Sequence, residues 1–339
     1  MSEAIEQRIQ VALDHMDGWL PGSTAGPKHP VFEWIAQDRA ANRLDNFTAS
    51  GIESLAEMTT TLDFVDPPIA GIASVRHRLR IASDENELWN IRLELAVARM
   101  LVLAGVAFRF GGPPNPEPDF VVEGAGLGIE VTRRDYDGVD DLVQVLSHLV
   151  DSLPLIVTLT FDNYPLQIRQ AKRREIMTLI ADAIAKGERI ETIHEIDTFT
   201  GPFVLTVDVS DASDMGEDSK VRVEVESPAL ARTMEQVELA ILSKTRDAQK
   251  LEQARSMPTI IVVESSDVGY AWMRSMATWE AVLRTWMTPE FPFLGIGLVQ
   301  RNILVPGLGY AFVLNPHADA SALARGATVL AQIAANYSP

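Results

Sequence analysis

The stretch PEPDFVVEGAGLGIEVTRRD, residues 116–135, carries the most informative pattern of this chain. It holds two short apolar segments, 118–123 and 127–132, on either side of a glycine-rich turn. Apolar segments of this length bounded by turn residues are typical of strands. The stretch therefore predicts a β-hairpin with its turn centred on residues 124–125.

Two acids of this hairpin are expected to face each other. Side chains alternate between the two faces of a strand, and a turn at 124–125 pairs Asp119 directly with Glu130. Their Cβ atoms then lie about 4.5–5.5 Å apart, where two carboxylates repel unless a cation lies between them. The pairing indicates a divalent metal site. The alternative is an edge hairpin whose two acids lie in water.

The overall composition is that of a globular protein of one large or two ordinary domains. The chain has 339 residues, of which 47% are hydrophobic and 22% are charged. No apolar run approaches the ~20 residues that a membrane helix needs. The N-terminal sequence lacks the basic and apolar regions of a secretory signal, so we expect a cytoplasmic location and no membrane partner.

The residue types that are absent or scattered limit the metal chemistry. The chain has no cysteine, which excludes disulfides, thiolate zinc sites and cysteine nucleophiles. The six histidines stand far apart and form no HxH or HxxxH pair. Any metal site would therefore use oxygen ligands, which suits Mg²⁺, Mn²⁺ or Ca²⁺.

The charge balance restricts the partners. A formal net charge of −18 argues against broad nonspecific binding of nucleic acid, which relies on basic side chains. Two local basic clusters, at 76–80 and 169–175, remain as candidates for a nucleic-acid surface. The alternative for each cluster is a solvated helix face.

A long helix is expected immediately before the hairpin. Ser83 or Asp84 suits the N-cap of a helix over 85–104, which Gly105 ends. Glu94 falls on the apolar stripe of this helix. An acid within such a stripe is costly to bury without a partner, and a metal-bound hairpin packed over the helix would supply one.

The order of these features resembles the PD-(D/E)XK, or restriction-endonuclease-like, superfamily of metal-dependent phosphodiesterases. The matching residues are Glu94 on the first helix, Pro118-Asp119 on one strand and Glu130-Val131-Thr132 on the next. The resemblance covers roughly residues 85–265.

The resemblance implies a fold, a cofactor and an activity. The fold is α/β, with an αβββαβ core and a mixed sheet. The cofactor is Mg²⁺ or Mn²⁺, held by Asp119, Glu130 and the Val131 carbonyl, with Glu94 assisting through metal-bound water. The activity is hydrolysis of phosphodiester bonds in nucleic acid, in which the metal activates water and neutralises charge on the phosphate.

The chain departs from this family at the catalytic lysine, because Thr132 stands where the strand lysine is expected. Arg133 points to the opposite face of the strand and is a poor substitute. Lys244 is a better candidate, because it falls on the apolar seam of a helix expected over 228–255 and would point at Glu130. The alternative is that Lys244 extends its ammonium to solvent. Gln249 on the same helix is a weaker polar candidate.

The remaining segments complete the expected organisation. We expect a helical N-terminal extension at 1–82, a core at 83–315 and a C-terminal helix at 316–339. The core carries an insertion at about 135–228, which includes two alternating segments, 203–209 and 220–226, expected to form a hairpin.

The insertion is expected to set substrate choice or to form a homodimer contact.

The sequence leaves two functions open for the chain as a whole. The chain is expected to be a metal-dependent nuclease. A binding or scaffold module that kept the fold and lost catalysis is the alternative, favoured by Thr132 and by the acidic charge.

Overall fold

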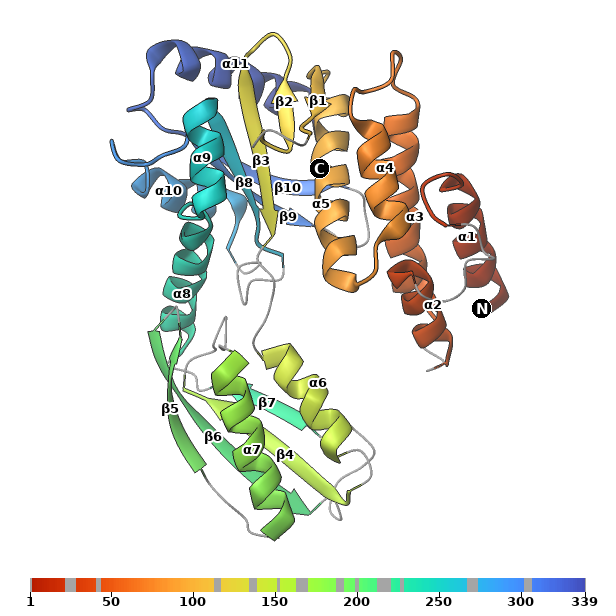
Figure 1. Ribbon diagram of the computed structural model, residues 1–339, viewed down its shortest axis with the longest axis vertical. Helices are drawn as coiled ribbons and strands as arrows, with labels where there is room; N and C mark the ends of the chain where they lie inside the picture. Colours follow the sequence, from red (N-terminus) through yellow and green to blue (C-terminus); the bar gives the residue numbers. More distant parts are fainter. Residues whose placement is uncertain are drawn as a thin grey trace. The chain divides into compact units, whose positions relative to one another are not determined.

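The computed structural model of the chain describes residues 2–21, 29–40, 44–112, 117–133, 139–150, 153–162, 170–186, 192–198, 201–211, 221–225, 229–266, 274–301 and 307–338 (Figure 1). Helices and strands interleave along it, which confirms the mixed α/β class. The chain forms two compact units. The first contains residues 1–133, 244–266 and 274–339, and the second contains 134–243 and 267–273.

The first unit begins with helices. They are α1 (Ser2–His15), α2 (Pro30–Ala40), α3 (Asn46–Asp63), α4 (Ile72–Ile81) and α5 (Glu85–Leu103). The expected start of α5 is confirmed, because the Asp84 side chain accepts a hydrogen bond from the Glu87 N–H. Gly105 follows its end with a positive φ of 71°, a conformation that glycine adopts at little cost.

A mixed sheet follows in the same unit. Its strands are β1 (Phe108–Phe110), β2 (Phe120–Val122), β3 (Leu127–Arg133), β8 (Thr259–Glu264), β9 (Gly295–Arg301) and β10 (Leu308–Leu314), in that spatial order. The β1-β2-β3 meander is antiparallel, β3, β8 and β9 are mutually parallel, and β10 returns antiparallel. Helices α9 (Ala248–Ser256), α10 (Met276–Thr285) and α11 (Ala320–Asn336) belong to this unit.

The register of the hairpin agrees with the sequence prediction. Phe120 pairs with Ile129 and Val122 with Leu127, so the strands turn about residues 124–125. One step further from the turn, this register sets Asp119 opposite Glu130.

One apolar core joins the N-terminal helices to the sheet. It includes buried side chains of α1, α3, α5, β1, β2, β3 and α11, among them Phe120, together with Trp19 from the segment after α1. Helix α5 packs against α3 on one side and against β3 and β10 on the other. Because α5 is nearly enclosed, its buried positions include the charged residues Arg92 and Glu94.

The prediction of a single helix over 228–255 is wrong. The structure has α8 (Ala229–Lys244) and then α9, separated by residues 245–247. Asp247 is the N-cap of α9, and its carboxylate accepts hydrogen bonds from the N–H groups of Gln249 and Lys250. A new N-cap restarts the helix with a new rotational phase, so the seam assumed for a continuous helix does not extend past Lys244.

The second unit has its own sheet and core. It contains α6 (Val139–Val150), β4 (Leu155–Phe161), α7 (Gln170–Lys186), β5 (Thr192–Thr198), β6 (Gly201–Asp211), β7 (Val221–Val225) and α8 up to Ser243. Helices α6 and α7 contribute to a separate core of buried aliphatic residues and Phe161. The insertion expected at about 135–228 lies within this unit.

The hairpin expected between 203–209 and 220–226 is also wrong. The strand order is β5-β6-β4-β7, so β4 lies between the two segments. It runs antiparallel to β6 and parallel to β7, and the hairpin partner of β6 is β5. Alternation of apolar residues marks a strand but does not name its neighbour.

A further sequence expectation concerns membrane helices. Within the part of the chain that is described, no helix has the length and apolar character needed to cross a bilayer.

Candidate active site

Close packing around Pro118 sets the position of Asp119. A Cβ on Gly128 would lie 2.3 Å from Pro118 Cγ, and a Cβ on Gly111 would lie 2.0 Å from the Pro118 carbonyl oxygen. The glycines therefore let the chain on either side approach the proline. The Gly111 N–H also donates to the Asp119 carbonyl at 2.8 Å. Asp119 is thus fixed where the chain enters β2.

The two hairpin acids are held by each other's strand. The Val131 N–H donates to Asp119 Oδ2 at 2.8 Å, and the Asp119 N–H donates to Glu130 Oε2 at 3.2 Å. Each carboxylate therefore takes one backbone hydrogen bond across the hairpin. The Asp119 N–H thus joins the two acids that the sequence expected to face each other.

A lysine from α9 completes the surroundings of Glu130. Lys250 Nζ lies 2.6 Å from Glu130 Oε1, and only 15% and 6% of these two side chains are exposed. The sequence analysis expected Lys244 to fill this place. Lys244 is instead the last residue of α8, and the lysine hydrogen-bonded to Glu130 stands six residues later, on the helix that Asp247 starts.

Glu94 also lies within the first unit, and its partner is a cation from α4. Arg78 donates from Nη1 to Glu94 Oε1 at 2.9 Å and from Nη2 to Glu94 Oε2. This bidentate pair resolves the cost of an acid on the apolar stripe of α5, for which the sequence analysis invoked a metal-bound hairpin.

The surroundings make the hairpin acids easier to protonate. Burial, followed by the charges of Glu130 and Glu94, raises the pKa of Asp119 well above its usual range. Burial also raises the pKa of Glu130, although Lys250 and the Asp119 N–H partly offset this rise. A divalent cation would relieve the repulsion that raises the pKa of Asp119, because it favours the ionised form.

The β3 side chains that follow Glu130 alternate between the two faces of the sheet, as expected for a strand. Thr132 is buried beside Glu130 on β3. Arg133 Nε lies 3.9 Å from Glu264 Oε2, and its guanidinium lies over the Trp89 ring. It is not the cation that contacts Glu130.

The weaker candidate on α9, Gln249, is exposed. Gln253, one turn after Lys250, is buried and donates to the Glu117 carbonyl at 3.0 Å. Neither Lys250 nor Gln253 was among the residues predicted from the sequence. The N-cap residue Asp247 is the sequence signal that could have found them.

The donor set fits a hard divalent cation in part. Asp119 and Glu130 supply carboxylate oxygens, the ligands that Mg²⁺ and Mn²⁺ favour. Asp119 Oδ1 accepts no hydrogen bond from the residues that the structure describes. No three acidic or histidine side chains in the described ranges stand together as a ready metal-ligand set, and both oxygens of Glu94 contact Arg78.

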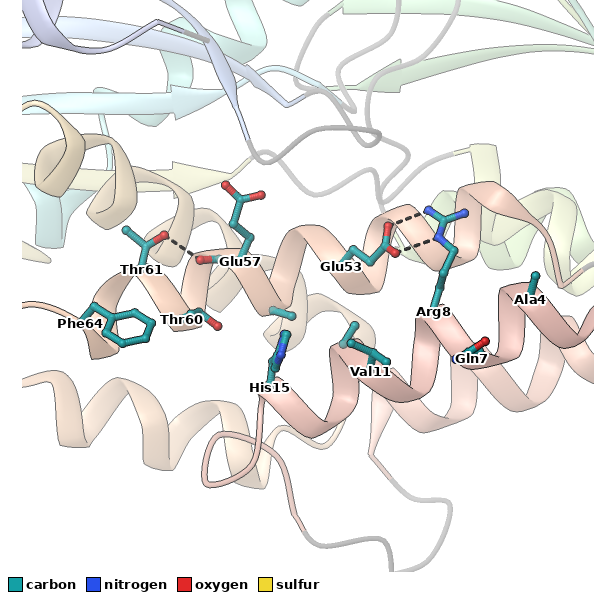
Figure 2. Close-up of a pocket in the computed structure, with 12 residues that line it drawn as sticks. Ala4, Gln7, Arg8, Val11, His15, Glu53, Glu57, Thr60, Thr61 and Phe64 are labelled. Carbon is teal, nitrogen blue, oxygen red and sulfur yellow. Dashed lines mark hydrogen bonds and ion pairs between the residues drawn. The ribbon is translucent and has the colours of Figure 1, made fainter.

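A separate groove lies between α1 and α3, in the N-terminal helices (Figure 2). It encloses about 610 Å³, and none of its lining residues is one of the three site acids. Arg8 and Glu53 form a bidentate ion pair beside it, while Val11 and Phe64 are exposed apolar residues. The charged pair in this groove is already matched within the chain.

Comparisons of this chain with protein-family models, with curated proteins and with solved structures found no match. The assignment of a function therefore depends on the fold and on the geometry of the site alone.

Proposed function

We propose that this chain is a nuclease that hydrolyses phosphodiester bonds of nucleic acid with Mg²⁺ or Mn²⁺. The contact between Lys250 and Glu130 carries the proposal, because it supplies a cation where the sequence has Thr132. Desolvation of a largely buried lysine and carboxylate costs free energy that their attraction does not always repay, and ionisable groups in such surroundings are concentrated at functional sites.

The order of elements supports the same proposal. Helix α5 precedes an antiparallel β1-β2-β3 meander, and α9 precedes β8, which is parallel to β3. This is the αβββαβ order that the resemblance to PD-(D/E)XK enzymes implies. Asp119 immediately precedes the second strand of that order, Glu130 stands on the third strand, and Glu94 stands on the first helix.

The roles of the residues follow from their contacts. When bound at Asp119 and Glu130, a divalent cation would neutralise charge on the phosphate and lower the pKa of bound water. The Val131 N–H orients Asp119, and Lys250 favours the ionised form of Glu130. The Lys250 ammonium is also placed to hold or position water beside Glu130, since proton transfer needs contact or one intervening water.

A second function keeps the fold without catalysis. Thr132 and the formal net charge of −18 favour a binding or scaffold module, because both depart from what a nuclease needs. The two functions differ in whether the acids do chemistry.

Cleavage assays test the proposal. Labelled single-stranded DNA, duplex DNA and RNA are incubated with the protein in Mg²⁺, in Mn²⁺ and in excess chelator. Asp119→Asn, purified in the same way, controls for contaminating nucleases. We expect cleavage that needs the metal and is lost in the variant. Equal cleavage by both proteins, or none with any substrate in either metal, would favour the scaffold function.

A further inference from the structure

Arg78 presents its guanidinium both to the site and to solvent. It binds both oxygens of Glu94, yet 42% of its side chain is exposed, against 11% for Glu94. One edge of the guanidinium is therefore occupied by the acid while part of the group still faces water. Arg78 lies on α4, outside the segment 85–265 that the family resemblance covers.

Arg78 also lies in the field of the acid that precedes β2. The hydrogen bonds to Glu94, and then the negative charges of Glu94 and Asp119, raise the pKa of Arg78, so both acids act on its guanidinium. The site as a whole has three carboxylates, from Glu94, Asp119 and Glu130, and two cations, from Arg78 and Lys250. One net negative charge remains, which is little attraction for a divalent cation.

The pair with Glu94 has the geometry that also binds phosphate. A guanidinium offers two parallel N–H donors that fit a carboxylate or a phosphate equally well. Both oxygens of Glu94 already accept hydrogen bonds from Arg78. A phosphodiester entering the site would offer the guanidinium a second anion of matching shape.

We propose that Arg78 binds a phosphate of the nucleic acid, and that it occupies Glu94 until that phosphate draws the guanidinium away. The inference depends on the proposed function, because it assigns a substrate contact in the same site. In the free protein, Arg78 competes with the divalent cation for Glu94. In the complex, Arg78 binds the substrate.

Because Arg78 has these two roles, its substitution should change the affinity for a divalent cation and the affinity for nucleic acid in opposite directions. Removal of Arg78 leaves the site with one more net negative charge and frees Glu94, so the affinity for a divalent cation rises. The same substitution removes a phosphate contact, so the affinity for nucleic acid falls. A residue that only holds the fold together would lower both affinities.

Titration calorimetry with Mn²⁺ alone tests the expected rise in affinity for a divalent cation. We expect Arg78→Ala to bind Mn²⁺ about tenfold more tightly than the native protein, from the Coulomb energy of one charge on a divalent cation at a partly buried site. Arg8→Ala is the matched control. It breaks a similar bidentate pair, with Glu53, that lies beside the groove between α1 and α3 (Figure 2).

Fluorescence anisotropy with a labelled oligothymidylate, measured in the presence of chelator, tests the expected fall in affinity for nucleic acid. We expect Arg78→Ala to lose affinity and the slope of log K against log salt to become shallower by about 0.7, the value for one phosphate contact on a single strand. Arg8→Ala is expected to keep both values. Circular dichroism and thermal unfolding check that each variant folds. Arg78→Gln, which is neutral and of similar length, takes the place of the alanine variant if the latter does not fold.

The outcomes separate this inference from the proposed function. Metal-dependent cleavage by the native protein together with an unchanged or weaker Mn²⁺ affinity in Arg78→Ala would overturn the role of Arg78 alone. No Mn²⁺ binding by the native protein or by either Arg78 variant would overturn both proposals. Tighter Mn²⁺ binding with unchanged affinity for the oligonucleotide would overturn the phosphate contact.

Discussion

Lys250 on α9 donates a hydrogen bond of 2.6 Å to Glu130 on β3, across 120 residues of sequence. Residues 134–243 of the second unit lie within that interval of the chain, so the contact brings together two segments that the sequence separates widely. It gives Glu130 a positively charged neighbour that the threonine at position 132 cannot provide. The following predictions depend on this contact and on the hairpin that holds Asp119.

The first prediction identifies the catalytic lysine. Lys250→Ala should abolish metal-dependent cleavage, because Glu130 loses its cation and the site loses a group that positions water. Lys244→Ala should keep activity, since Lys244 ends α8 in front of the break. Cleavage rates under saturating metal measure both variants. Loss of activity in the Lys244 variant with retention in the Lys250 variant would reverse the assignment.

The second prediction concerns the stability cost of Asp119. Its pKa is raised in the folded protein, mainly by burial, above the ordinary value of 3.8. The folded state therefore holds the proton more tightly than the unfolded state, and stability falls as pH rises from about 3.8 toward the raised value. Asp119→Asn removes this loss, so its gain in the free energy of unfolding should be larger at pH 7 than at pH 4.

Chemical denaturation at the two pH values measures this difference. The two values lie on either side of the isoelectric point of about 4.7, so the protein carries a net charge at each, which limits precipitation. Glu123→Gln is the control, because it removes an exposed acid of the same hairpin. A gain in Asp119→Asn that is equal at both pH values, or larger at pH 4, would contradict a raised pKa of Asp119.

The third prediction concerns the packing that fixes Asp119. Gly128→Ala forces a methyl group against Pro118, and overpacking of this kind costs about 1–3 kcal/mol. Activity should fall further than stability alone explains, because Pro118 precedes Asp119. Gly112→Ala is the control, since a Cβ there meets nothing within 4 Å. Denaturant unfolding and cleavage rates measure the two effects, and equal behaviour of the two variants would sink this explanation.

The fourth prediction tests the start of α9. Asp247→Ala removes the side chain that accepts from the N–H groups of Gln249 and Lys250, and should cost about 1 kcal/mol. Cleavage should decrease as well, because the first turn of α9 carries Lys250. Asp319→Ala removes the N-cap of α11, a helix that carries none of the proposed site residues. It should cost similar stability and leave cleavage intact, and a loss of cleavage there would mean that stability alone controls activity.

The hairpin could be predicted from the sequence because its signal is local. Alternation and the turn residues at 124–125 set which side chains pair, so Asp119 and Glu130 followed directly. The helix over 85–104 and its cap at Asp84 were predictable for the same reason. In each case the residues that decide the structure are neighbours along the chain.

The lysine and the partner of Glu94 could not be predicted in this way. Lys250 reaches Glu130 only because Asp247 restarts the helix, and the sequence analysis treated 228–255 as continuous. Arg78 was read within a basic cluster that suited a solvated face, since nothing local connects it to Glu94. The strand order of the second unit failed for the same reason, because β4 enters between two strands that follow it in sequence. Contacts between distant segments depend on packing that sequence periodicity does not encode.

The metal site at the hairpin is tested by Mn²⁺ titration calorimetry on the native protein and on Asp119→Asn, with Glu123→Gln as the control. We expect one binding site in the native protein and in the Glu123 variant, and none in Asp119→Asn. Binding that survives unchanged in Asp119→Asn, or no binding in the native protein, would contradict a metal site at the hairpin.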